Sequence, residues 1–364
     1  MWRSVLVLSL LCWGTGGAVT CKDERNNAVP WYILYKAPSL QSKSLTGLEY
    51  LYIDSTTERT VHAVPPFYNG IADRNGVLAN TLQPMFTPIR SMPATFGFIS
   101  YSDQPPGSRA SDKFGHSKGV LMMDKTSTGV WLFHSTPQFP FRRDRDHFWP
   151  DSGTTNAQIF LCVTFPYSEF NKIGTHLQYI RAYPFEHDLP ADFHQELRDA
   201  ANWVSAQPSN NFMTLMSTDP FQRFSSIAKR TSEQPKDGDL YVTLAQGLNS
   251  DVHVQTWGGQ PDRKRSLCII GYKKVLNVKS ISTYLGDWEP GNDHSKWCVT
   301  KSQDNLWVCI GDVNRATTQY QRWGGALCME NARIQHAFLQ FARATDDCSA
   351  LDSMREFYGL QLTG

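Results

Sequence analysis

The sequence GHSKGVLMMD at 115–124 and the sequence DHSKWCVT at 293–300 share the tripeptide His-Ser-Lys, and its two copies lie 178 residues apart. Each copy is followed by an apolar run typical of a buried strand, by a turn, and by a second apolar run that contains a tryptophan. Seven residues beyond each tryptophan stands a carboxamide, Gln138 in the first copy and Asn314 in the second. This repeated order predicts two related halves that share one cleft.

The paired motifs suit chemistry on a phosphodiester. Residues i and i+2 of an extended strand point to the same face, so His116 with Lys118, and His294 with Lys296, could each meet one phosphate together. One neutral imidazole can attack phosphorus while the other, when protonated, gives its proton to the leaving oxygen. The lysines and carboxamides would stabilise charge on the phosphoryl oxygens, which is work that a metal ion would otherwise do. We therefore predict that these four residues are catalytic, with no metal ion and no cofactor.

Composition places the chain among large folded proteins. Its 364 residues are 41% hydrophobic and 12% aromatic, which excludes a disordered chain and a small disulfide-stapled scaffold. A formal net charge of +1 excludes a protein that binds nucleic acid by overall charge alone, but it allows a locally basic cleft. The sequence contains no Cys-x-x-Cys and no His-Glu-x-x-His, so neither a structural zinc site nor a zincin site is expected.

The first 18 residues have the pattern of a secretion signal. Arg3 supplies the positive charge, 5–11 is apolar, and 16–18 offers small residues for cleavage. The apolar run is too short to span a bilayer, so we expect a signal peptide over 1–18 and no stable membrane anchor. Cys12 would leave with the signal, and an oxidising compartment would pair most of the seven remaining cysteines and leave one unpaired.

Apolar runs alternate with stretches of helical periodicity along the chain, which is typical of an α/β fold. The runs expected to form strands are 31–35, 119–123, 130–133, 159–165, 241–245, 267–272 and 307–310. Helices are expected over 192–207, with Asp192 as the N-cap, and over 332–344.

The paired His-x-Lys units resemble those of the phospholipase D superfamily, and the sequence around them is similar to the deoxyribonuclease II family over nearly the whole mature chain. Beyond the motifs, the similarity is carried by VPWYILYK (29–36), YSDQPP (101–106), FLCVTFP (160–166), CIGDVNR (309–315) and GGALC (324–328). The resemblance implies a phospholipase D-like pseudo-dimer, in which two mixed-sheet halves flanked by helices have one active site between them. We place the N-terminal half at 19–190 and the C-terminal half at 191–364.

The resemblance also implies an acid endonuclease that cuts DNA without a divalent metal, through two histidines and a phosphohistidine, and leaves 3′-phosphate and 5′-hydroxyl ends. His294 matches the position that the family treats as its active-site histidine, Lys296 stands beside it, and His116 and Lys118 match the partner half. Motifs that read bases are absent, so DNA binding should be largely independent of sequence. The family resides in lysosomes and some members are secreted; the absence of an Asn-x-Ser/Thr sequon here leaves secretion open. The oligomeric state is not indicated.

Similarity to the family further implies the disulfides Cys21–Cys162, Cys268–Cys348 and Cys309–Cys328, and it leaves Cys298 as a free thiol. The wider superfamily has an aspartate at a fixed distance beyond each motif lysine. Here Asp124 comes one residue later, and the second copy has no aspartate before Asp304. Asp312 and His134 are therefore the candidates for supporting and orienting the histidines, against a purely structural role for each.

Two other functions are compatible with the same motifs. A phospholipase D-like lipid or nucleotide phosphodiesterase would use the same residues but would need an apolar slot in place of a groove for DNA. A catalytically silent, secreted DNA-binding protein would keep the fold without the chemistry. Both His-x-Lys motifs are complete, which favours an enzyme.

Overall fold

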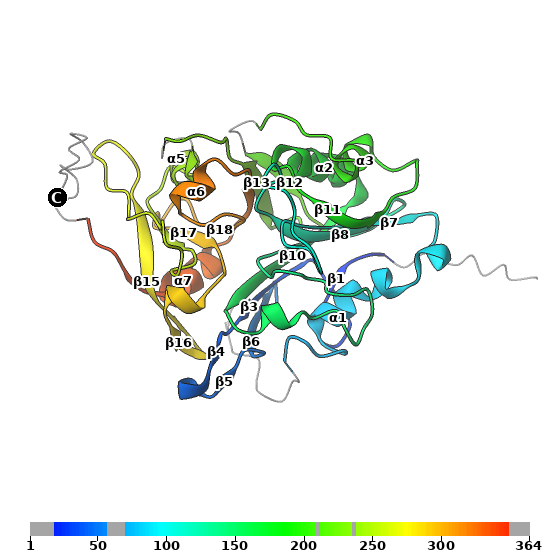
Figure 1. Cartoon of the computed structure of the whole chain (residues 1–364), viewed down its shortest axis with the longest axis horizontal. Coiled ribbons are helices and arrows are strands. Elements are labelled where there is room, and N and C mark those ends of the chain that lie inside the picture. The colour runs from blue at the N-terminus through cyan, green and yellow to red at the C-terminus, as the bar shows by residue number, and fades with distance from the viewer. Residues whose placement is uncertain (1–17, 57–69, 209–211, 235–237, 349–364) are drawn as a thin grey trace, which may run out of the picture.

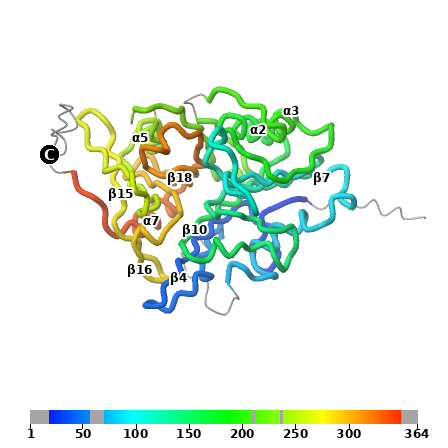
Figure 2. Tube along the Cα trace, viewed as in Figure 1, coloured from blue at the N-terminus to red at the C-terminus, as the bar shows by residue number. Residues whose placement is uncertain are grey.

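The computed structural model describes residues 18–56, 70–208, 212–234 and 238–348, and it shows a mixed α/β fold built around two large sheets. The expected signal peptide lies outside the described residues, apart from Ala18. In Figure 1 strands β7 (Phe96–Ser102) and β8 (Lys118–Asp124) lie to the right of strands β15 (Val275–Thr283) and β17 (Trp297–Thr300). The backbone trace in Figure 2 shows the same separation.

The first sheet has seven strands, and every neighbouring pair in it is antiparallel. Their order is β11 (Pro184–Asp188), β7 (Phe96–Ser102), β8 (Lys118–Asp124), β9 (Thr128–His134), β10 (Gln158–Pro166), β3 (Trp31–Lys36) and β6 (Tyr50–Asp54). Every residue of β3, β7 and β8 is buried, because helices cover both faces of the sheet. α2 (Phe170–Tyr179) and α3 (Gln195–Ala201) pack on one face, and α1 (Val77–Leu82) packs on the other.

The second sheet has nine strands, of which only β14 and β15 pair in parallel. Their order is β12 (Met213–Met216), β13 (Arg223–Ala228), β19 (Gly325–Glu330), β18 (Trp307–Gly311), β17 (Trp297–Thr300), β14 (Val252–Gln255), β15 (Val275–Thr283) and β16 (Gly286–Trp288), and β20 (Ala342–Thr345) also pairs with β15. α7 (Ala332–Phe341) and α5 (Leu240–Gly247) pack against this sheet in different apolar clusters.

The two sheets share a core. One apolar cluster contains Trp131 and Leu161 from the first sheet together with Val299 and Ile310 from the second. Burial of this common surface holds the sheets together, because apolar area removed from water stabilises a fold by about 25 cal/mol per Å². The elements outside the sheets and main helices are short: β1 (Cys21–Lys22), β2 (Ala28–Val29), β4 (Ser39–Leu40), β5 (Leu45–Thr46) and α6 (Thr317–Tyr320). No helix in the described ranges is long and apolar enough to cross a bilayer.

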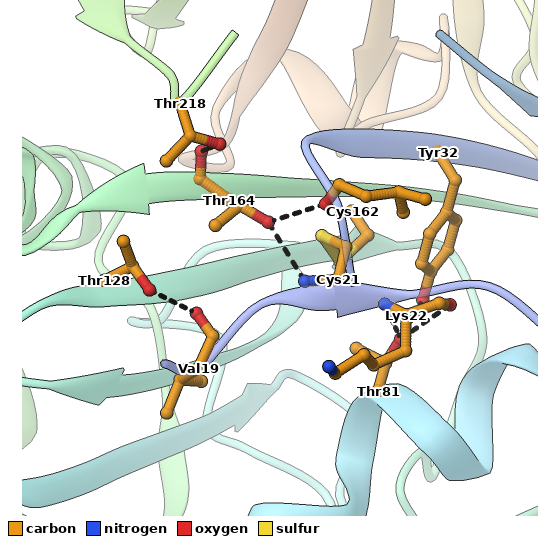
Figure 3. Close-up of a disulfide and its surroundings, with 10 residues drawn as sticks. Val19, Cys21, Lys22, Tyr32, Thr81, Thr128, Cys162, Thr164 and Thr218 are labelled. Atoms are coloured by element: carbon orange, nitrogen blue, oxygen red, sulfur yellow. Dashed lines mark hydrogen bonds between the residues drawn. A yellow bond between two sulfur atoms is a disulfide. The ribbon is translucent and has the colours of Figure 1, made fainter. Parts of the chain in front are cut away.

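The described residues contain three disulfides, Cys21–Cys162, Cys268–Cys348 and Cys309–Cys328, which are the pairs that the resemblance implies. Cys298 is buried and unpaired. Figure 3 shows the first disulfide, which ties β1 to β10. Beside it the hydroxyl of Thr164 accepts a hydrogen bond from the Cys21 amide and donates one to the Val29 carbonyl, both at 3.0 Å. The N-terminal segment is thus anchored to the first sheet by both covalent and polar contacts.

Most of the expected strands are present, and two are wrong. The runs at 31–35, 119–123, 130–133, 159–165 and 307–310 fall in β3, β8, β9, β10 and β18. The run at 241–245 instead lies in helix α5, whose first turn is capped by the Asp239 carboxylate accepting from the Tyr241 amide at 2.9 Å. A five-residue apolar run does not distinguish a buried strand from a buried helix, and the cap decides between them. At 267–272 only Leu267 forms a bridge, and Ile270 is 73% exposed in the turn that follows.

Both expected helices are shorter than the periodicity indicates. α3 covers Gln195–Ala201 with His194, not Asp192, at its N-cap, and it ends before Trp203, whose φ of 64° is left-handed. α7 begins after Asn331, whose side chain accepts from two backbone amides of the first turn, and the residues after Phe341 turn into β20. The mixed α/β class is confirmed, and the pseudo-dimer remains a prediction.

Candidate active site

The two His-Ser-Lys copies line a single pocket of about 300 Å³. His116 lies in the connection between β7 and β8, and Lys118 is the first residue of β8. His294 and Lys296 come from the segment that leads into β17. The pocket therefore collects side chains from both sheets. Its lining is mostly polar or charged: Asp103, Gln104, Arg109, His116, Lys118, Ser135, Pro137, Trp257, Gln260, His294, Lys296, Asn314, Gln319 and Arg322.

His116 is held by two residues of the connection between β18 and β19 of the second sheet. Its backbone amide donates to the Trp323 carbonyl at 2.9 Å, and its Nδ1 lies 2.6 Å from the backbone carbonyl oxygen of Asp312. A carbonyl oxygen can only accept, so this contact places the proton on Nδ1. The other nitrogen, Nε2, lies 4.0 Å from a carboxylate oxygen of Asp103, and both His116 and Asp103 line the pocket. The tautomer and orientation of this ring are therefore set by a segment distant in sequence.

The backbone of His294, which precedes a strand of the second sheet, is held by a residue next to the first sheet. Its amide donates to the carbonyl of Ala157 at 2.9 Å, and the residue before it, Asp293, pairs with Ala157 in a parallel bridge. The buried Asp293 carboxylate accepts from the hydroxyl of Tyr35 on β3 at 2.5 Å, and from Trp288 Nε1 at 2.8 Å. The contacts with Tyr35 and Ala157 hold the segment that carries the second motif against β3 and the start of β10.

The imidazole of His294 meets an aromatic ring rather than a carboxylate. The Trp257 indole lies edge-on to it, with ring centroids 4.8 Å apart. Lys296 turns back so that its Nζ donates to the His294 carbonyl at 2.7 Å. The two histidines thus differ in their surroundings, since His116 has a carboxylate nearby and His294 has cations.

The buried carboxylate of Asp103 lies within 4.0 Å of three basic groups. Lys118 Nζ lies 2.5 Å from its Oδ1, while Arg322 Nη2 and His116 Nε2 lie 3.5 Å and 4.0 Å from its Oδ2. Burial alone would raise the pKa of Asp103, but the neighbouring Lys118, His116 and Arg322 outweigh it and hold that pKa below its ordinary range. Asp103 is therefore an anion that offsets the positive charge of the pocket.

Burial and the neighbouring lysines lower the pKa of both histidines and of Lys296. Burial lowers the pKa of His116 and of His294 to about 3, and in both cases Lys118 and Lys296 act in the same direction. Only His116 feels an opposing effect, from Asp103. Burial, reinforced by Lys118, likewise lowers the pKa of Lys296 to about 7. Both imidazoles are therefore neutral near pH 7, and Lys296 is at its titration midpoint there.

The predicted supporting residues do not all reach the pocket. Asn314 lines it, accepting from the Trp257 amide at 3.3 Å and donating to Gln260 Oε1 at 3.2 Å. Gln138 lies outside the lining; its backbone, with a left-handed φ of 60°, donates to the Gln104 carbonyl at 2.8 Å. The two halves of the repeat therefore place their carboxamides differently.

Asp312 and His134 also lie outside the lining. Asp312 reaches His116 through its backbone carbonyl, while its buried carboxylate accepts from the Gly325 amide at 2.8 Å. Burial raises the pKa of Asp312 well above its usual value. His134 is buried in the core, stacked on Phe160, and accepts from the Thr136 amide at 3.2 Å. Neither side chain is placed to touch a group bound between His116 and His294.

Several pocket residues were not predicted from the sequence. Asp103 and Arg322 supply charge, and Trp257 supplies the aromatic wall, whereas Trp297, the aromatic residue next to the second motif, is fully buried. Asp103 stands in the quoted segment YSDQPP, but nothing in its spacing marks it as a partner of Lys118. Within the described ranges, no three His, Cys, Asp or Glu side chains gather as a group that could hold a metal ion.

Comparison with known protein sequences gives consistent matches over nearly the whole chain. The family whose model matches residues 20–348 is described as Deoxyribonuclease II. Deoxyribonuclease-2-beta of Homo sapiens is 33% identical over 359 residues, covering 95% of this chain and 96% of the relative. Deoxyribonuclease-2-alpha of Rattus norvegicus is 33% identical over 364 residues, covering 95% and 99%. Plancitoxin-1 of Acanthaster planci is 33% identical over 359 residues, covering 95% and 97%. Among solved structures, yeast tyrosyl-DNA phosphodiesterase has a TM-score of 0.30 at 9% identity, covering 60% of this chain and 67% of that one.

Proposed function

This chain belongs to the deoxyribonuclease II family, and from that premise we propose that it is an acid endodeoxyribonuclease that cleaves DNA through His116 and His294 without a metal ion. The observation that carries the proposal is the meeting of both His-Ser-Lys copies in one pocket. The polar and charged lining suits a phosphodiester better than the apolar slot that a lipid would need.

We assign His294 as the nucleophile and His116 as the general acid. His294 has only cations among the charged groups that affect its pKa, so it stays neutral and its ring nitrogen keeps a lone pair for attack. His116 has Asp103 beside it, which favours its protonated form relative to His294. The diester phosphate adds negative charge next to both rings and raises their pKa, so substrate binding helps to load the proton on His116.

The proposed reaction has two displacements. A nitrogen of His294 forms a bond to phosphorus while the bond from phosphorus to O5′ breaks, and His116 gives its Nε2 proton to that oxygen. Water then attacks the phosphohistidine, His116 takes a proton from it, and the phosphorus–nitrogen bond breaks. The products are a 5′-hydroxyl and a 3′-phosphate. Lys118, Lys296 and Asn314 would stabilise the charge on the phosphoryl oxygens in both steps.

The broader setting of the activity is proposed on the family resemblance. The chain is expected to lose a signal peptide over 1–18 and to act in the lysosome or outside the cell. Its halves, 19–190 and 191–364, are proposed to be related as a phospholipase D-like pseudo-dimer. DNA is the proposed substrate, bound largely without regard to sequence.

The first prediction concerns metal ions. Supercoiled plasmid is expected to be nicked at pH 5 equally well with and without EDTA, because side chains carry out each step. The assay uses the purified, oxidised protein at pH 5 and pH 7.5, with product ends tested by a kinase that requires a 5′-hydroxyl. Loss of cleavage in EDTA would contradict the two-histidine mechanism, and an intact plasmid under all four conditions would contradict the nuclease.

The second prediction concerns pH. Because the free protein holds both histidines with a pKa of about 3, the fraction with one protonated imidazole falls about tenfold for each pH unit above that value. The value of kcat/KM is therefore expected to fall about tenfold per unit between pH 4 and pH 6.5. Above pH 7 the fall should steepen as Lys296 loses its proton.

Initial rates on a short oligonucleotide, measured well below KM, test this profile, with circular dichroism at each pH to show that the protein stays folded. A rate that is flat from pH 4 to pH 7 would contradict the assignment of a protonated histidine. The Lys296→Arg variant serves as a control for the upper limb, because arginine stays charged and should remove the extra steepening above pH 7.

A further inference from the structure

A second pocket, of about 140 Å³, lies immediately behind the loop that carries His116. Phe114, which lines it, is two residues from His116. The backbone carbonyl of Arg181, which also lines it, accepts a hydrogen bond from the Gly115 amide at 2.8 Å. On the other side, the Arg181 guanidinium lies 3.6 Å from the ring centroid of Trp323, the neighbour of the histidine-pocket residue Arg322. Two residues span at most about 7 Å, so Phe114 and His116, which line different pockets, lie within about one nucleotide of each other along this loop.

The second pocket contains an aromatic platform. Trp203 lies nearly parallel to Tyr183, with ring centroids 5.9 Å apart, and Phe114 meets both rings edge-on. Phe114 is buried, whereas Trp203 is 56% exposed. A rigid, half-exposed indole supported from behind by two further rings is the kind of surface on which nucleobases stack.

The same pocket carries positive charge that nothing in the described part of the protein neutralises. Lys113 and Arg181 line it, and neither side chain forms an ion pair or a hydrogen bond there. The Nε of Arg181 is buried without a partner, and its guanidinium lies over the ring of Trp323. A guanidinium held in this way is ready to bind an anion such as a phosphate.

The backbones of Arg181 and Trp203 have an unusual conformation. Arg181 has a φ of 48° and Trp203 a φ of 64°, in the left-handed region that glycine ordinarily fills at the end of a helix. A bulky residue adopts this conformation at an energetic cost and only where the surrounding structure imposes it. At Trp203 this conformation places an indole just beyond the end of α3, at a position where a glycine would end the helix without strain.

We infer that this pocket is a nucleobase subsite. It takes an unpaired base of the DNA strand whose phosphate occupies the histidine pocket: the base stacks on Trp203, and the flanking phosphate meets Arg181 and Lys113. The inference rests on the proposed function and deepens it, because it makes a locally unpaired strand the form of DNA that the enzyme engages. Stacking has no preference for a particular base, so this subsite fits a nuclease without sequence specificity.

The test compares two ligands of equal charge in a His294→Ala background, which binds without cutting. One ligand is a single-stranded DNA 12-mer, and the other is a 12-mer of abasic residues. Trp203→Ala is expected to weaken binding of the DNA 12-mer by about 5- to 150-fold and binding of the abasic 12-mer by less than about twofold. Trp203→Phe, which keeps a stacking ring, should recover most of the loss, and Arg181→Gln should weaken both ligands.

Phe221→Ala is the matched control, since Phe221 is 94% exposed and lines neither pocket; both affinities should stay unchanged in it. Equal losses for the two ligands in Trp203→Ala, or no loss for either, would overturn the subsite. Plasmid nicking by the unmutated protein separates this failure from failure of the proposed function. If the unmutated protein nicks plasmid but Trp203→Ala changes the affinity for both ligands equally, the protein has the activity without the subsite. If the unmutated protein does not nick plasmid, the proposed function itself is wrong.

Discussion

Replacing His294 by alanine is expected to lower DNA cleavage at pH 5 by at least about 10⁴-fold while leaving the protein folded. The variant removes the nitrogen that attacks phosphorus, and loss of a nucleophile is among the largest effects that a single substitution has on an enzyme. The fold should tolerate the change, because the His294 side chain is half-buried at the pocket and its described contact is with the Trp257 ring. Plasmid nicking gives the rate, and a thermal melt shows the fold.

The roles of the two histidines can be separated with a better leaving group. His116→Ala should cost about 10²- to 10⁴-fold on DNA, the usual range for a general acid. On thymidine 3′-(p-nitrophenyl phosphate), whose leaving group departs without a proton, the first step of His116→Ala should be largely restored, while His294→Ala stays inactive. Recovery of His294→Ala in place of His116→Ala would reverse the assignment. His147→Ala is the matched control, because His147 is an exposed histidine outside the pocket and its loss should change the rate less than about twofold.

Replacing Asp103 by alanine is expected to lower the free energy of unfolding by about 3–5 kcal/mol, because it leaves the buried Lys118 ammonium without its carboxylate. Cleavage should fall as well, since the same carboxylate favours the protonated form of His116. Denaturant unfolding measures the first effect and plasmid nicking the second.

A matched variant is Asp112→Ala. Its carboxylate is also ion-paired, to Arg109, but the side chain is 88% exposed, so the loss in stability should be within about 0.5 kcal/mol. A loss of less than about 1 kcal/mol in Asp103→Ala would show that Lys118 does not depend on this carboxylate.

The sequence predicted those parts of the site that repeat. The two His-Ser-Lys copies, each followed by a pair of strands, could be found because a duplicated pattern of motif and apolar run is visible without knowledge of the fold. Asp103 could not be found in this way. It becomes the partner of Lys118 only because β7 and β8 pair with Ser102 opposite Lys118, and strand register is a property of the folded sheet.

The parts that were wrong or missed depend on local caps and on distant segments. An apolar run at 241–245 becomes a helix through a single capping carboxylate, that of Asp239. The orienting partner of His116 was sought among side chains, but it is the backbone carbonyl of Asp312, and every residue has a carbonyl. Trp257 and Arg322 reach the pocket from the loops after β14 and before β19, far in sequence from His116.

Each histidine is held by a segment from the other half of the chain, and this affects the stage of synthesis at which the active site can form. The chain is synthesised from its N-terminus, so His116 is made long before the carbonyl of Asp312 that orients it, and His294 waits for its own strand to close on Ala157. A ribosome-bound chain that ends before residue 312 lacks the carbonyl that orients the imidazole of His116. The two-histidine centre is therefore complete only after the segment that follows β18 has been made and has folded against His116.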